Sequence, residues 1–115
     1  MIEKKFNILG NEWTLKLCTV EEDPRLKNCD GYTDFTVKQI AVDNSKGNDL
    51  NSLIDMNVYV KKVIRHELIH AFLTECGLRE CSTNSWATNE EMVDFFAYQF
   101  PKLDKLFNDL EVEND

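Results

Sequence analysis

The sequence predicts a single α+β domain, in which a small antiparallel or mixed sheet packs against two helices. Up to about Asn44, apolar and polar side chains alternate, which is the pattern of strands in a half-buried sheet. From Asn57 onward, apolar side chains recur every three or four positions, which is the spacing of amphipathic helices. A chain of 115 residues can enclose one hydrophobic core and leaves little room for a second domain.

The first strand pair is expected to be a hairpin. Residues 6–9 and 13–20 have strand character and flank a turn at Gly10, a residue type that tight turns favour. Residues 21–30 contain Pro24 and few apolar side chains, so they predict a loop or a single helical turn.

A second strand pair is expected at residues 31–35 and 38–42, where short alternating segments stand close together. Residues 43–49 are polar and contain Gly47, which predicts a connector between the sheet and the helical half. Sheet and helices would therefore occupy separate parts of the sequence, as in the α+β class.

The first helix is predicted over residues 57–76, from apolar side chains at helical spacing. Asp55 or Asn57 can cap its start, because short polar side chains accept hydrogen bonds from the first free amides of a helix. Gly77 stands where a glycine commonly ends a helix.

The second helix follows a loop that is expected to run through Ser85. Thr88 and Glu91 are three residues apart, which is the spacing of a capping box with Thr88 as the N-cap. Pro101 is expected to kink or end this helix, because proline has no backbone N–H. The domain would span residues 1–108, and residues 109–115 would form an acidic C-terminal tail.

Large aromatic side chains at strand or helix spacing are expected to belong to the core, because ordinary burial preferences favour it. They are Trp13, Phe35, Phe72, Trp86, Phe95 and Phe96.

The overall charge of −8 argues against nucleic-acid binding, since no basic stripe offsets it. The sequence has no run of about 18 apolar residues that would predict a membrane span. The N-terminal residues lack the apolar stretch of a secretory signal, so a cytoplasmic protein with reduced cysteines is expected. A monomer is also expected.

The segment His66-Glu67-Leu68-Ile69-His70 holds the only two histidines of the chain. Residues four apart share one face of a helix, so both imidazoles can reach a single metal ion. Glu67 directly follows the first histidine and is placed to take a proton from a water molecule on that ion. A pair of exposed or core histidines without a metal is the competing interpretation.

A third zinc ligand must be a carboxylate or a cysteine, because no other histidine exists. Glu90 and Asp94 are four residues apart on the second helix and share a face. We expect Glu90 to bind the metal and Asp94 to accept a hydrogen bond from a ligand histidine. Glu91 is the alternative ligand, although its position in the capping box gives it a local role. The acidic turn could instead be solvated and favoured by the helix dipole.

The pattern His66-Glu67-x-x-His70 followed by Asn89-Glu90-x-x-x-Asp94 resembles that of the gluzincins, the thermolysin-like zinc peptidases. In size the chain is similar to the minigluzincins and to ImmA/IrrE-type peptidases, which are common on phages. The resemblance covers residues 31–101. It implies a zincin-like fold with Zn²⁺ as cofactor, the second-helix glutamate as third ligand and the later aspartate beside the ligands.

The expected activity is zinc-dependent hydrolysis of peptide bonds in a peptide or protein substrate. His66, His70 and Glu90 would hold zinc, and Glu67 would take the proton from water and pass it to the leaving amine. By analogy with related peptidases, an edge strand at residues 38–42 would bind extended substrate by strand addition.

Two other functions compete with this one. The chain could be a non-catalytic or weakly catalytic zinc-binding regulator of phage or prophage origin, or zinc could only stabilise the fold. Structural zinc sites usually have four ligands rich in cysteine, which this helix pair does not offer. Larger gluzincins supply a further Tyr or His to stabilise the oxyanion. Tyr32, Tyr59 and Tyr98 are candidates here, although each is more simply a residue at the edge of the core.

Overall fold

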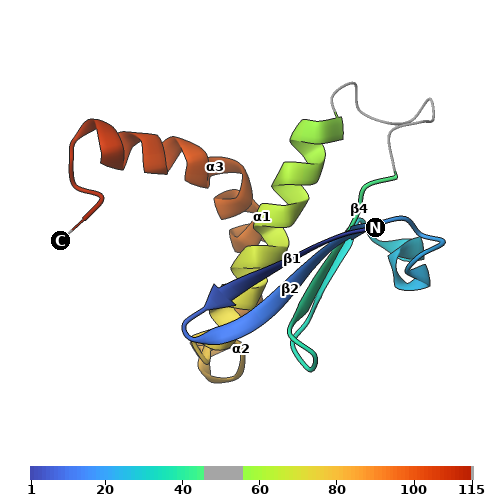
Figure 1. Cartoon of the computed structure of the whole chain (residues 1–115). Coiled ribbons are helices and arrows are strands. Elements are labelled where there is room, and N and C mark those ends of the chain that lie inside the picture. Colours follow the sequence, from blue (N-terminus) through green and yellow to red (C-terminus); the bar gives the residue numbers. More distant parts are fainter. Residues whose placement is uncertain (46–55, 115) are drawn as a thin grey trace.

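The computed structural model describes residues 1–45 and 56–114, and Figure 1 shows their arrangement. The strands β1 (Ile2–Ile8), β2 (Asn11–Cys18), β3 (Gly31–Asp34) and β4 (Gln39–Asp43) form one sheet in the order β1-β2-β4-β3. Helices follow the sheet in the sequence, which confirms the α+β class. No helix of the described residues is long and apolar enough to cross a membrane.

Both predicted strand pairs are present as antiparallel neighbours. Phe6 of β1 is opposite Trp13 of β2, and Thr33 of β3 is opposite Ile40 of β4. The turn between β1 and β2 uses Gly10 at φ 91°, a conformation that glycine adopts without steric cost. Between the pairs, Pro24–Asn28 forms a single 3₁₀ turn (η1), as one of the two predicted alternatives stated.

The pairing of β2 with β4 is parallel and makes the sheet mixed. It places β4 between β2 and β3, so the expectation that residues 38–42 form an edge strand is wrong. The edges are β1 and β3. In β4, Ile40, Ala41 and Val42 have no exposed surface, because both faces of the strand are covered.

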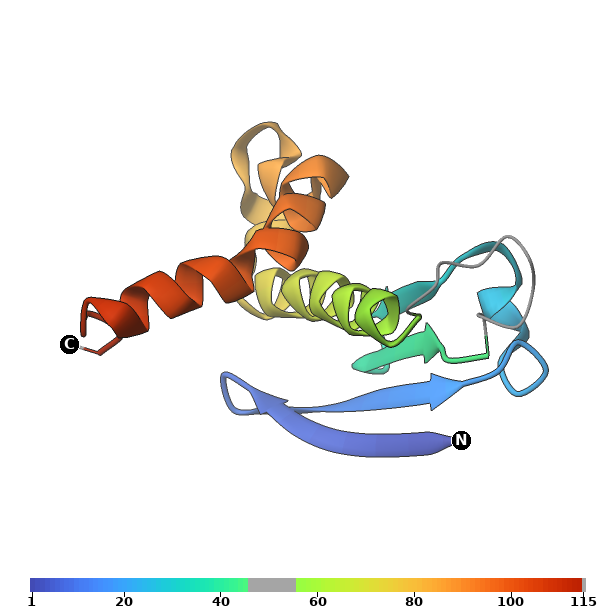
Figure 2. The same ribbon diagram turned by 90° about the horizontal axis from the view of Figure 1, so that it is seen from above.

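Helix α1 (Met56–Glu75) packs on one face of the sheet, as Figure 2 shows from above. Trp13, Ile40 and Val42 form the main core with Val63 and Ala71 of α1. A smaller cluster of buried hydrophobic residues lies on the other side of β4 and packs against η1.

The start of α1 differs from its prediction, and its end agrees. Asn57 lies inside the helix and cannot be its N-cap, while Asp55 and the last part of the 43–49 connector lie outside the described residues. Gly77 follows the helix at φ 79°, which confirms the predicted glycine at its end. Glu75 in the last turn accepts hydrogen bonds from Trp13 Nε1 and Lys38 Nζ, both at 2.7 Å. This carboxylate ties α1 to the sheet.

The segment predicted as a loop through Ser85 contains two short helical pieces, α2 (Leu78–Cys81) and η2 (Thr83–Thr88). Helix α3 (Glu90–Asp109) follows, with Asn89 as its N-cap, because Asn89 Oδ1 accepts a hydrogen bond from Met92 N at 2.9 Å. The predicted capping box of Thr88 and Glu91 is therefore wrong by one residue. The Thr88 hydroxyl donates instead to the backbone oxygen of Ser85.

Pro101 lies inside α3 and does not end it. Figures 1 and 2 show α3 changing direction between its first and second half, in line with a kink, the other expected effect of this proline. The carbonyl of Ala97, four residues earlier, would normally accept from the amide of residue 101, which proline lacks. Arg65 Nε of α1 donates to this carbonyl instead. The helix therefore continues, and the hydrogen bond holds α3 against α1.

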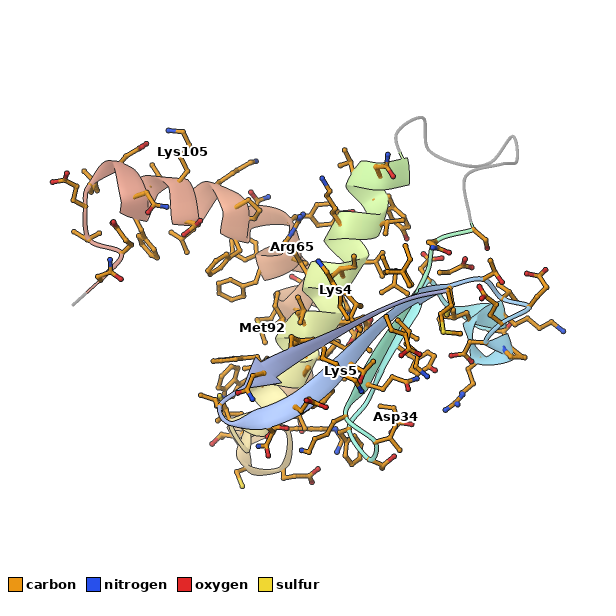
Figure 3. The ribbon with its side chains drawn as sticks, viewed as in Figure 1. Lys4, Lys5, Asp34, Arg65, Met92 and Lys105 are labelled. Carbon is orange, nitrogen blue, oxygen red and sulfur yellow. The ribbon has the colours of Figure 1, made fainter. Side chains whose placement is uncertain are left out.

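Of the aromatic residues predicted to form the core, only Trp13 is buried. Phe35, Phe72, Trp86, Phe95 and Phe96 are all exposed, so their assignment to the core is wrong. For α3 the reason is that its two buried residues, Val93 and Ala97, lie in its first half. The second half extends away from α1 and the sheet, as the position of Lys105 in Figure 3 shows.

Candidate metal centre

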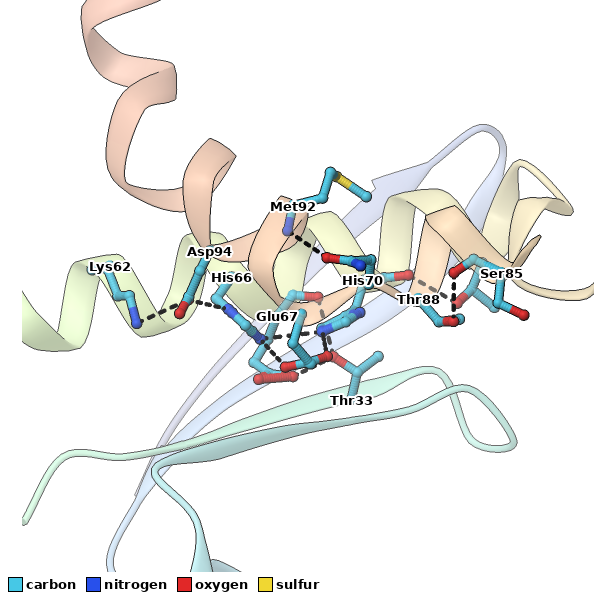
Figure 4. Close-up of polar contacts among 12 residues, drawn as sticks. Thr33, Lys62, His66, Glu67, His70, Ser85, Thr88, Met92 and Asp94 are labelled. Carbon is cyan, nitrogen blue, oxygen red and sulfur yellow. Dashed lines mark hydrogen bonds and ion pairs between the residues drawn. The ribbon is translucent and has the colours of Figure 1, made fainter. Parts of the chain in front are cut away.

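Three side chains that can bind a metal converge between α1 and the start of α3 (Figure 4). His66 Nε2 and His70 Nε2 are 3.1 Å apart. The Glu90 carboxylate lies 3.1 Å from His66 Nε2 and 2.8 Å from His70 Nε2 through its two oxygens. Within residues 1–45 and 56–114, this is the group of three or more potential ligands whose donor atoms lie within 4.8 Å of one another.

Local structure explains this convergence. His66 and His70 are one turn apart on α1, so their side chains leave the same face. Glu90 is the first residue of α3, and the cap made by Asn89 defines where that helix starts. The hydrogen bond from Arg65, the neighbour of His66, to α3 keeps the two helices together at this level.

Asp94 lies one turn after Glu90 and contacts the far side of His66. Its Oδ1 atom is 2.7 Å from His66 Nδ1 and 3.1 Å from Lys62 Nζ. Burial raises the pKa of Asp94, but the hydrogen bonds from Lys62 and His66 outweigh it and the pKa is lowered. An ionised Asp94 accepts a hydrogen bond from the Nδ1–H group of His66. In that tautomer Nε2 carries no proton, and its lone pair is free to face the cluster.

Glu67 lies beside the cluster and is 7% exposed. Thr33 Oγ1 of strand β3 is 2.9 Å from Glu67 Oε1 and 3.1 Å from the Glu67 backbone oxygen. Burial raises the pKa of Glu67, although the Thr33 hydrogen bond and the charges of His66 and His70 act in the opposite direction. A carboxylate with a raised pKa is a stronger base, as a proton acceptor near neutral pH should be.

The cluster opens into a cavity of about 390 Å³ between β3, α1 and the segment before α3. Its lining includes Thr33, His66, Glu67, His70, Arg79 and Glu90. A second cavity, of about 220 Å³, adjoins the other side of His66 and is lined in part by Tyr59, Lys62 and Asp94. The site is thus a half-buried cleft that a ligand can enter.

The tyrosines considered as oxyanion donors are engaged elsewhere. Tyr32 donates to Asp23, and its burial and this hydrogen bond raise its pKa to about 12. Tyr59 donates to Asp30, and this hydrogen bond and burial raise its pKa to about 12 as well. Tyr98 is 53% exposed beside Lys62. Tyr32 and Tyr59 therefore direct their hydroxyl protons at other carboxylates and not at the cluster.

The structure brings together His66, Glu67, His70, Glu90 and Asp94, all of which the sequence singled out. Glu91 is exposed and lies outside the cluster, so the geometry favours Glu90 as the third ligand.

Sequence reasoning missed Thr33, Lys62 and Arg79. Lys62 could have been found, because it lies one turn before His66 on the same helix face. Thr33 and Arg79 reach the site only through tertiary packing, and no sequence pattern marks them.

Comparison with models of known protein families, with curated proteins and with solved structures finds no match to this chain. A functional assignment therefore rests on the residues of the site.

Proposed function

We propose that this protein is a zinc-dependent metallopeptidase with a zincin-like arrangement of its two long helices. One observation carries the proposal. The ligand atoms of His66, His70 and Glu90 lie within 4.8 Å of one another, and the buried carboxylate of Glu67 lies next to them. Two imidazoles, one carboxylate and a neighbouring glutamate are the groups that a hydrolytic zinc site requires.

The donor set suits zinc in a catalytic rather than a structural role. Catalytic zinc sites commonly use three protein ligands and keep one position open, and two histidines with one glutamate are a known combination. Structural sites are usually closed by four ligands, often cysteines, and no cysteine joins this cluster among the described residues. The contact of Asp94 with His66 supplies the outer hydrogen bond that ligand histidines nearly always make.

The proposed mechanism assigns one task to each group. His66, His70 and Glu90 would hold the ion, which when bound supplies Lewis acidity toward water and toward a peptide carbonyl. Glu67 takes a proton from the attacking water and delivers it to the amine of the leaving peptide. Thr33 is a positioning residue, because its hydroxyl holds one oxygen of Glu67 and leaves the other available.

The test is cleavage of an unfolded, carboxymethylated protein by the zinc-loaded chain, followed by mass spectrometry of the fragments. Glu67→Gln should retain zinc and lose hydrolysis by at least about 100-fold, the usual lower bound for general acid–base catalysis. Glu91→Gln is the matched control, because Glu91 is an exposed acidic residue in the first turn of α3, next to Glu90. This variant should cleave the substrate like the parent. Equal cleavage by Glu67→Gln would refute the mechanism. Zinc binding without any cleavage by the parent would favour a non-catalytic zinc-binding regulator.

A further inference from the structure

The second half of α3 exposes large apolar side chains that no described element covers. Helix α3 is described throughout, and none of its residues after Ala97 is buried. Figures 1 and 2 both show this half extending away from α1 and the sheet. The exposed fractions are 60% for Phe95, 37% for Phe96, 48% for Phe100, 56% for Leu106, 39% for Phe107 and 72% for Leu110.

These side chains follow a heptad pattern. Phe96, Phe100, Leu103, Phe107 and Leu110 are spaced by four, three, four and three residues, which places them in one stripe along the helix. This is the spacing with which one helix packs against another in a coiled coil. Phe95 and Leu106 widen the stripe, and together with Phe96, Phe100 and Leu103 they line an apolar groove of about 260 Å³. We call this set of seven residues the α3 seam.

The area of the α3 seam matches what a dimer requires. From the exposed fractions, and with about 150–250 Å² for each aromatic side chain, the seam presents roughly 600 Å² of apolar surface. The largest apolar patch of a typical monomeric protein is about 300–600 Å² and is often functional, so the seam lies at the upper end of that range. If the seams of two copies pack against each other, they and the residues around them would bury a total area within the range of about 1,200–2,000 Å² that stable interfaces have.

The charges beside the α3 seam permit self-association. The whole chain carries a charge of −8, but Lys102 and Lys105 balance Asp104 and Asp109 along this half of the helix. In an antiparallel pair, the acidic residues after Leu110 would lie at opposite ends. They would be about 21 Å apart along the axis, at 1.5 Å per residue over the length of the seam. An antiparallel two-fold pair therefore brings the apolar faces together and keeps the two acidic C-terminal segments apart, with each directed toward the acidic first turn of the partner's α3.

We propose that the α3 seam is a homodimer interface, in which α3 packs antiparallel against α3 of a second copy of this chain. The interface is isologous, so each seam residue is buried in both copies. The stripe begins just after the turns that carry Glu90 and Asp94, and the metal cluster stays outside it. This inference does not depend on the proposed peptidase activity.

The test is sedimentation equilibrium of the full chain from about 1 to 200 µM, with Phe100→Glu and Phe107→Glu as seam variants. The parent should reach twice the 13.4 kDa of one chain. Each seam variant should raise the dimer dissociation constant by at least about 100-fold. In a two-fold interface the substitution is present in both copies, so two glutamate charges would have to be buried. Circular dichroism checks the fold of both variants, which alter exposed side chains only.

Val37→Glu is the matched control, because Val37 is 65% exposed in the turn between β3 and β4, away from α3. It should dimerise like the parent. A parent that remains monomeric up to 200 µM would overturn the proposal, as would seam variants that dimerise as tightly as the parent. Flotation with phosphatidylcholine vesicles is the companion measurement. A monomer that binds the vesicles through the seam would assign this face to a membrane surface and would also overturn the proposal.

Discussion

Asp94→Ala should weaken zinc binding without abolishing it. The carboxylate of Asp94 accepts the Nδ1 proton of His66 at 2.7 Å, and a hydrogen bond to a charged group contributes about 1.5–3 kcal/mol. Removing it should lower zinc affinity by about 10–100-fold, since each factor of ten corresponds to about 1.4 kcal/mol. The same substitution removes the carboxylate that pairs with the ammonium group of Lys62. The positive charge of Lys62 then disfavours a cation at the nearby metal site, which lowers zinc affinity further.

The assay is titration with zinc in competition with a chromophoric chelator, with the fold of each variant checked by circular dichroism. Glu90→Ala should weaken binding more than Asp94→Ala, because it removes a proposed ligand. Glu91→Ala should bind zinc like the parent, because Glu91 is exposed and outside the cluster. Parent-like affinity of Asp94→Ala would refute the role of this hydrogen bond. A larger loss for Asp94→Ala than for Glu90→Ala would make Asp94 the third ligand.

Two predictions concern the scaffold of the site. Gly31→Ala should destabilise the protein by about 1–3 kcal/mol, because a Cβ atom at Gly31 would lie 2.9 Å from Val63 Cγ1 and would push β3 from α1. Urea unfolding measures this change, and an unaltered midpoint would contradict the close approach. Glu75→Gln should destabilise at pH 7 but not in acid. Hydrogen bonds from Lys38 and Trp13 lower the pKa of Glu75, so its stabilisation is present above the ordinary pKa of 4.5 and is lost as the pH falls through the lowered value. An equal effect of the substitution at pH 7 and pH 3 would contradict this linkage.

The features that local geometry determines could be predicted from the sequence. His66 and His70 share a helix face because they are four residues apart, and the same holds for Glu90 and Asp94. Strand alternation on either side of Gly10 predicted the first hairpin, and Gly77 marked the end of α1. These patterns depend on spacing and on backbone preference, both of which are visible in one sequence.

The features that depend on tertiary packing could not be predicted. The parallel pairing of β2 with β4 joins segments that are distant in the sequence, so alternation alone did not show that β4 is central. Pro101 does not end α3, because Arg65 of another helix satisfies the carbonyl that proline leaves open. Thr33 reaches Glu67 from the edge strand, and no spacing rule connects the two residues.

A metal centre at His66, His70 and Glu90 is tested most directly by the zinc content of the purified chain, measured by elemental analysis after saturation with zinc and gel filtration. We expect close to one zinc per chain in the parent and a marked loss of zinc in His66→Ala and His70→Ala. A parent chain that retains no stoichiometric zinc, or histidine variants that retain as much as the parent, would contradict a metal centre at His66, His70 and Glu90.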